Sequence, residues 1–137
     1  MQNARLIHLL NRQFNREVGA ILRYMIEAAS LNGADHAAAR SQYLKEVGEK
    51  VEHAQYLANQ IVALGGTPAL TPDFGCPRAT VREMLRRDAA EEQTDEQNYL
   101  QLASEAEKAR LAALRLKMQE QAAVEHEHVC AMERLLW

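Results

Sequence analysis

Close to the end of the chain, Glu125 and His128 are separated by two residues. On a helix this spacing puts a carboxylate and an imidazole on one face, where both can bind the same metal ion. A related stretch, EKVEH (49–53), also carries acids and a histidine. Here, however, Lys50 stands three residues before His53, where the matching acid would be expected. The two stretches suggest a metal site in which a lysine replaces one ligand.

The composition of the chain is typical of a small helical protein. It has 137 residues, with six Gly and three Pro, and aromatic residues make up only 5%. We expect a single domain over residues 1–137, which is large enough to bury a core. The formal charge of -3, without a cluster of Lys and Arg, argues against a nucleic-acid partner. No apolar run is long enough to cross a membrane, so no membrane partner is expected.

The first residues and the two cysteines predict a cytoplasmic protein. The apolar run near the N-terminus is too short for a secretion signal. Cys76 and Cys130 lie far apart in the sequence. Without a secretion signal, such a pair is more often two free thiols than a disulfide.

Turn-forming residues predict where the first two helices end. The first covers about residues 3–30 and stops near Asn32-Gly33. The second covers about residues 36–64 and ends at Gly65-Gly66, a typical C-cap signal. The following stretch, GTPALTPDFGCPRAT (66–80), contains all three prolines and predicts a long connection.

The second half of the chain predicts two more helices. Thr80 is placed to cap the third helix, and Glu83 completes a capping box. From Val81 to the end there is no Gly or Pro. One helix of that length would span roughly 85 Å, which is too long for this domain, so we expect a turn around residues 104–111. The predicted fold is all-α, a four-helix bundle with a crossover between the second and third helices.

Each predicted helix carries an ionisable residue near the middle of its core-facing side. Bundle helices repeat apolar residues at spacings of four and three along the face towards the core, which we call the seam. Apart from the central ionisable residues, the predicted seams are apolar except at Glu96 in the third helix and Gln121 in the fourth. The central residues are Glu17, Lys50, Glu92 and Glu125, with His128 one turn further on. An unpaired charge in a core is costly. We therefore expect the four helices to bring these residues together.

The prediction of a metal site rests on the joint pattern of three acids and two histidines at one level of the bundle. Taken singly, each acid is more often a solvated helix residue than a ligand. His53 lies at the edge of the same face as Lys50, whereas Glu49 and Glu52 are predicted to turn further outward. Glu49 is therefore not expected simply to replace the missing acid. His126 is predicted to lie at the surface.

In these stretches the chain resembles the ferritin-like superfamily, and bacterioferritin most closely. The resemblance rests on LLNRQFNREVGAILRYMIEA, EHAQYLANQIVALGGTPAL, VREMLRRDAAEEQ and VEHEHVCAMERLL, one stretch from each helix. In that family two Glu-x-x-His pairs and two further Glu residues hold two irons. The resemblance implies metal ligands at Glu17, His53, Glu92, Glu125 and His128. It implies iron as the metal, with Mn or Zn as alternatives.

The family's second bridging carboxylate falls on Lys50, which leaves three outcomes open. One metal ion binds, through Glu92, Glu125 and His128, because the remaining negative charge suffices for one divalent ion. Alternatively, no metal binds and Lys50 bridges Glu17 and Glu125. In the third outcome two irons bind beside a neutral Lys50. The first two are favoured, because an ammonium repels cations and offers them no lone pair.

The resemblance implies a protein of iron storage or oxidation, since family members oxidise Fe(II) with O2 or peroxide at paired irons. With Lys50 in the site, we expect a ferritin-like iron-binding protein with weakened or absent ferroxidase activity. One alternative is a bundle with a structural or partner-binding role, in which salt bridges replace the metal. Another is an oxidase of an organic substrate, which an apolar pocket beside Glu92 and Tyr99 would favour.

Two further departures from bacterioferritin concern haem and assembly. The methionine that ligates haem in that family falls on Val51, so no haem is expected at the usual site. The chain ends directly after the fourth helix, without the family's short fifth helix, so a full 24-subunit cage is not expected. We expect a homodimer through the first two helices, where Leu6, Leu9 and Leu22 need cover, with a larger assembly as the alternative.

Overall fold

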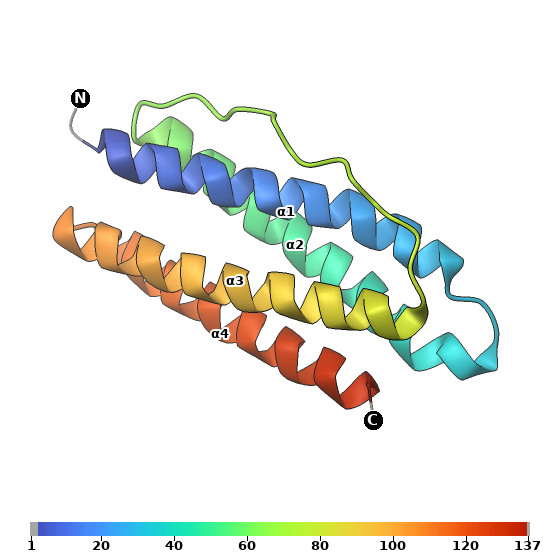
Figure 1. Cartoon of the computed structure of the whole chain (residues 1–137). Coiled ribbons are helices and arrows are strands. Elements are labelled where there is room, and N and C mark those ends of the chain that lie inside the picture. Colours follow the sequence, from blue (N-terminus) through green and yellow to red (C-terminus); the bar gives the residue numbers. More distant parts are fainter. Residues whose placement is uncertain (1–2, 137) are drawn as a thin grey trace.

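The computed structural model describes residues 3–136 and consists of four long helices and one short one (Figure 1). The elements are α1 (Ala4–Ser30), the 3-10 helix η1 (Ala34–His36), α2 (Ala37–Ala63), α3 (Val81–Lys108) and α4 (Ala112–Leu135). The predicted all-α bundle with a long crossover between α2 and α3 is confirmed. The short helix η1 was not predicted.

The ends of the helices follow from local chemistry. Thr80 caps α3 as predicted: its side chain accepts a hydrogen bond from the Glu83 N–H, and the Glu83 carboxylate accepts one from the Thr80 N–H. The turn between α3 and α4 occupies residues 109–111, within the predicted window. At its centre Arg110 has a φ of 60°, a left-handed conformation that usually selects glycine.

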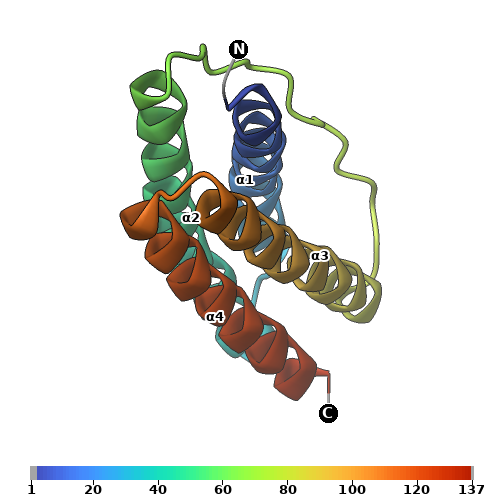
Figure 2. The same ribbon diagram turned by 90° about the vertical axis from the view of Figure 1, so that its left-hand side faces the viewer.

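The helices form two hairpins that stack on each other. α1 packs along α2, and α3 packs along α4. Between the hairpins, α1 contacts α3 and α2 contacts α4 (Figure 2). The crossover between α2 and α3 runs along α1, from one end of the bundle to the other (Figure 1).

Two asparagines one turn apart on α1 hold the crossover in place. The Asn11 side chain accepts a hydrogen bond from the Ala69 N–H at 2.7 Å and donates one to the Thr67 carbonyl at 3.2 Å. The Asn15 side chain accepts from the Thr71 N–H at 2.7 Å and donates to the Ala69 carbonyl at 2.9 Å. The amides therefore satisfy backbone groups that an extended segment would otherwise leave to water.

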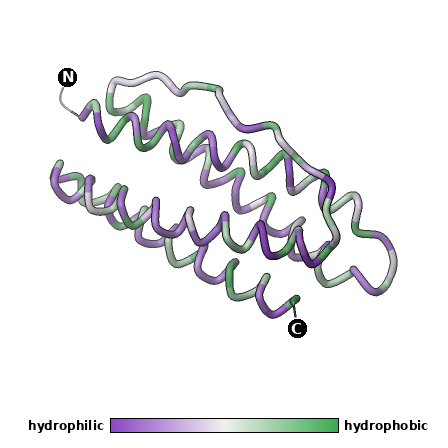
Figure 3. The backbone as a smooth tube through the Cα atoms, in the orientation of Figure 1, coloured by the Kyte–Doolittle hydropathy of each residue, from purple (hydrophilic) through white to green (hydrophobic). Residues whose placement is uncertain are grey.

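The core consists of two apolar clusters separated by a polar layer. One cluster gathers around Leu10, Leu57 and Met118, towards the N-terminal end of α1. The other gathers around Tyr43 and Leu85, towards the opposite end of the bundle. Hydrophilic and hydrophobic residues alternate along all four helices, as expected of helices buried on one side (Figure 3). The ionisable residues predicted at mid-helix lie between the two clusters.

Some details of the predicted faces are wrong. Leu6 and Leu9 are buried within the bundle and need no partner, whereas Leu22 is exposed. Glu96, placed on the core-facing seam, is only half-buried, and Asp95 is buried in its place. Within residues 3–136, no helix is long and apolar enough to span a membrane.

Candidate metal centre

The five residues predicted as metal ligands come together in the polar layer. Glu17 projects from α1, His53 from α2, Glu92 from α3, and Glu125 and His128 from α4; none is more than 7% exposed. Each makes at least one close contact with another member of the set or with Lys50. The joint sequence pattern therefore predicted a real spatial cluster.

Lys50 lies in the middle of this cluster and is fully buried. Its Nζ is 3.2 Å from Glu92 Oε1, 3.6 Å from Glu125 Oε2 and 3.7 Å from Glu17 Oε2. It also lies 5.3 Å from the centre of the Tyr24 ring, a cation–π distance. One ammonium thus contacts carboxylates from the three other helices.

The charge of Lys50 shapes the ionisation of its neighbours. Burial opposes a charged lysine, but Glu125, Glu17 and Glu92 outweigh it and hold the pKa of Lys50 well above its usual value. Burial likewise opposes a charged Glu92, yet Lys50 and the nearby ring of His128 lower the pKa of Glu92 to about 2. The pKa of Glu125 is lowered against the same burial, first of all by Lys50. Without a bound metal ion, the centre therefore holds Lys50 as a cation.

Glu17, His53 and Glu125 form one half of the centre, with ligand atoms within 4.8 Å of one another. His53 Nδ1 is 3.4 Å from Glu125 Oε1 and 4.0 Å from Glu17 Oε1. Gln13 and Tyr99 donate hydrogen bonds to Glu17 Oε1, at 3.1 and 2.9 Å. Burial raises the pKa of Glu17 to about 7, although Lys50 opposes this shift.

Glu46, Glu92 and His128 form the other half. His128 Nδ1 faces Glu46 Oε1 at 3.2 Å, Glu92 Oε2 at 3.3 Å and Glu125 Oε2 at 3.5 Å. Burial opposes a charged histidine, but the carboxylates of Glu125 and Glu92 beside its Nδ1 raise the pKa of His128 to about 11. Burial and the neighbouring carboxylate of Glu92 raise the pKa of Glu46 to about 9. At neutral pH, Lys50 and His128 are therefore the cations that face the anions Glu92 and Glu125.

Glu49 also reaches the centre, although it was predicted to point away from it. Its carboxylate is 30% exposed and contacts Nε2 of His128, the ring nitrogen on the opposite side from Nδ1. A carboxylate on the second nitrogen of a metal-binding histidine orients the ring and fixes its tautomer. Glu49 is therefore a partner of His128 and not a substitute for the acid missing at position 50.

Glu46, Asp95 and Gln13 were missed, although a signal for them exists. The buried positions of α2 run 39, 43, 46, 50, 53/54, 57 and 61, an alternation of four and three. That register includes Glu46 and His53, whereas the predicted seam took Val47 and Ala54. The same alternation in α3 includes Asp95 instead of Glu96.

The residues of the centre fit a bound metal ion. Most of the buried side-chain nitrogen and oxygen atoms without a hydrogen-bond partner, within the described residues, belong to it. They include oxygens of Glu17, Glu46, Glu92 and Glu125 and the Nδ1 atoms of His53 and His128. Buried atoms of this kind are normally satisfied, and carboxylate oxygens with imidazole nitrogens suit Fe(II), Mn(II) or Zn(II).

A groove between α2 and α4 leads to the centre from solvent. It has a volume of about 930 Å³, and its lining includes Glu49, His53, Gln121 and His128. Both histidines of the centre therefore border a space that ions can enter.

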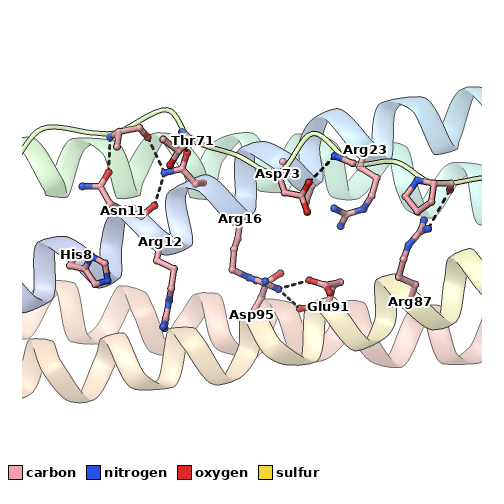
Figure 4. Close-up of a pocket in the computed structure, with 16 residues that line it drawn as sticks. His8, Asn11, Arg12, Arg16, Arg23, Thr71, Asp73, Arg87, Glu91 and Asp95 are labelled. Atoms are coloured by element: carbon pink, nitrogen blue, oxygen red, sulfur yellow. Dashed lines mark hydrogen bonds and ion pairs between the residues drawn. The ribbon is translucent and has the colours of Figure 1, made fainter.

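A second cleft, of about 770 Å³, follows α1, the crossover and α3 (Figure 4). Arg16 projects across it towards α3, with Nε 2.7 Å from Asp95 and Nη2 2.8 Å from Glu91. Gln13 donates hydrogen bonds to both Asp95 and Glu17, at 3.1 Å each. A chain of polar contacts therefore links the wall of this cleft to Glu17.

A crossover four-helix bundle whose helices carry carboxylates and histidines to one buried layer is typical of carboxylate-type metalloproteins. The ferritin-like domain family matches the chain over residues 7–137. The chain therefore belongs to the ferritin-like family, and the resemblance found in its sequence is confirmed at that level.

Two solved structures are similar to it. A ferritin-like, diiron-carboxylate protein from Bacillus anthracis str. Ames is 30% identical with a TM-score of 0.92, and the match covers 97% of this chain and 96% of that one. A bacterioferritin-related protein from Bacteroides fragilis, described as a dodecameric thioferritin, is 23% identical with a TM-score of 0.89; the match covers 99% of this chain and 86% of that one. The second likeness concerns the fold alone. No curated protein sequence matches the chain.

Proposed function

We propose that this protein is a bacterioferritin-related iron-binding protein that takes Fe(II) as its substrate and holds one metal ion per chain instead of two. The observation that carries the proposal is the ammonium of Lys50, in contact with Glu17, Glu92 and Glu125. The similar protein from Bacillus anthracis is described as a diiron-carboxylate protein. We expect Lys50 to take the place of one of the two ions.

The ion is best accommodated around Nδ1 of His128. Glu92 and Glu125 face this nitrogen, and Glu46 adds a carboxylate from α2 that the resemblance did not supply. Lys50 competes with an ion in both halves of the centre, because its nearest carboxylate is Glu92 at 3.2 Å and it also contacts Glu17 and Glu125. The preference for the His128 half rests on its third carboxylate, Glu46. When the ammonium of Lys50 is removed by substitution, Glu17 and His53 are the proposed ligands of a second ion.

Bound Fe(II) would supply electrons to O2 or peroxide, the chemistry that membership of the ferritin-like family implies. Two adjacent irons can share a two-electron step, whereas one ion delivers a single electron, so we expect weakened ferroxidase activity. The protein's own part is to hold the carboxylates in place. Tyr24 donates a hydrogen bond to Glu92 at 2.8 Å, and Tyr99 donates one to Glu17 at 2.9 Å.

A second candidate is a metal-free bundle with a structural or partner-binding role. It is favoured by the internal balance of charge, in which Lys50 and His128 face Glu92 and Glu125. A metal ion would have to displace the proton of His128 before binding at Nδ1. The two candidates therefore differ in whether iron competes successfully with that proton.

Metal content per chain tests the proposal. The native protein, Lys50→Glu and Lys50→Gln are loaded with ferrous iron under anaerobic conditions, desalted and measured by elemental analysis. We expect one iron in the native chain and two in Lys50→Glu, which restores a carboxylate and should oxidise Fe(II) faster. Lys50→Gln is the matched control, because it removes the ammonium without adding an anionic ligand. A second iron there would show that the ammonium alone excludes it, and a single iron would show that the missing carboxylate is needed as well.

Other results would decide against the proposal. Two irons in the native chain would show that the ammonium does not exclude the second ion. No iron in the native chain or in Lys50→Glu would favour the metal-free bundle.

A further inference from the structure

A cysteine and a histidine lie side by side on the outer surface of α4, apart from the buried centre. Cys130 Sγ is 3.7 Å from Nε2 of His126, one helical turn away. Nδ1 of the same ring is 2.8 and 3.3 Å from the two carboxylate oxygens of Glu96 on α3. Cys130 is half-buried, and the His126 side chain is 64% exposed. Both residues line the groove between α2 and α4.

The distance between the two donor atoms matches a shared metal ion. With bonds of about 2.3 Å to sulfur and 2.0–2.1 Å to nitrogen, a tetrahedral ion would separate Sγ from Nε2 by about 3.6 Å. The observed 3.7 Å requires almost no rearrangement. Glu96 holds the ring by its other nitrogen, in the carboxylate–histidine arrangement that orients metal-binding histidines.

We propose that Cys130 and His126 form a second metal site, on the surface, for a thiophilic ion such as Zn(II). Sulfur and imidazole donors select Zn(II) or Cu(I) over ions that prefer oxygen ligands. Two protein donors leave the remaining positions to water, so the bound ion stays exposed in the groove. The site is independent of the function proposed for the buried centre, because it shares no ligand with it.

Cobalt(II) is the probe, because a thiolate bound to cobalt gives a charge-transfer absorption that carboxylate and imidazole ligands do not give. The titration is made anaerobically with a non-thiol reductant. Cys76→Ser, which removes the cysteine of the crossover, should keep the band, and Zn(II) should abolish it by competition. Cys130→Ser and His126→Ala should lose the band, and Glu96→Gln should weaken cobalt binding roughly tenfold.

Two controls separate this site from the buried centre. Glu46→Gln changes a carboxyl of the buried centre, which contains no thiol, and should leave the band intact. Loss of the band there would show that the surface site depends on the centre and would overturn its independence. In Cys76→Ser, where Cys130 is the remaining thiol, bound Zn(II) should slow alkylation several-fold. A band that survives in Cys130→Ser, or alkylation that Zn(II) does not slow, would equally overturn it.

Discussion

The ammonium of Lys50 stands where three buried carboxylates converge, and there it supplies the positive charge that a metal ion supplies in other bundles of this kind. A buried carboxylate left without a partner loses its hydration and gains nothing in return. We therefore expect two effects of the lysine: a lower capacity of the centre for metal, and a centre that folds without metal.

The second effect can be measured as stability. Lys50→Met should lower the free energy of unfolding of the metal-free protein by about 3–5 kcal/mol, because it leaves buried charges uncompensated. Urea denaturation in the presence of a chelator measures this loss. Lys45→Met is the matched control: that side chain is 67% exposed, and its contact with Glu49 at 3.8 Å is worth at most about 1 kcal/mol. Equal stabilities of the native protein and Lys50→Met would show that the carboxylates do not need the ammonium.

The sequence predicted the residue types of the centre better than its full membership. Glu17, Lys50, Glu92, Glu125 and His128 stand out because an acid or a base interrupts an apolar seam. Glu46 was missed because the seam of α2 was shifted by one residue to Val47, an apolar alternative on nearly the same face. Burial decides between the two: Glu46 is fully buried, and Val47 is only half-buried. The hydrophobic pattern alone favours Val47 over Glu46, because the sequence of one helix does not show that Glu46 contacts His128 on another.

At the scale of the elements, the helix ends that carry a clear capping signal were predictable from the sequence. For the turn between α3 and α4, the sequence predicted only a range of residues. Thr80 with Glu83 and the glycine at position 65 mark their boundaries directly. Arg110 occupies a left-handed position without being glycine, so the sequence contains no mark of that turn. Chain length alone indicated that a turn had to exist.

The crossover depends on α1 in a way that the sequence did not reveal. Asn15→Ala should destabilise the protein by about 1–3 kcal/mol, because the Thr71 N–H and the Ala69 carbonyl both lose their partner. Urea denaturation gives the loss, and amide hydrogen exchange should show faster exchange at Thr71. Asn11→Ala, at a more exposed position, should cost less and should act at Ala69. Unchanged exchange at Thr71 in Asn15→Ala would show that the crossover holds its path without the amide.

At the scale of the whole molecule, the bundle leaves an apolar surface on α1 and the crossover beside it. Leu22, Met25 and Ile26 of α1 are 40%, 52% and 59% exposed, and Phe74 of the crossover is 72% exposed. These four side chains border one small hollow together with Cys76. A contiguous exposed apolar patch of this kind usually marks a contact with another protein.

This surface is where we expect two copies of the chain to associate. It retains α1 and Leu22 from the predicted dimer contact, and the crossover takes the place of α2. Replacing Ile26 by lysine places a charge in the middle of the patch, which should dissociate the dimer, since an unpaired charge is costly to bury. Sedimentation velocity across a range of concentrations measures the change. Leu116→Lys is the matched control, because Leu116 is 53% exposed but lies on α4. We expect a smaller species for Ile26→Lys and no change for Leu116→Lys. A native protein that sediments as a monomer would contradict the dimer. A dimer that persists in Ile26→Lys and dissociates in Leu116→Lys would place the contact on α4.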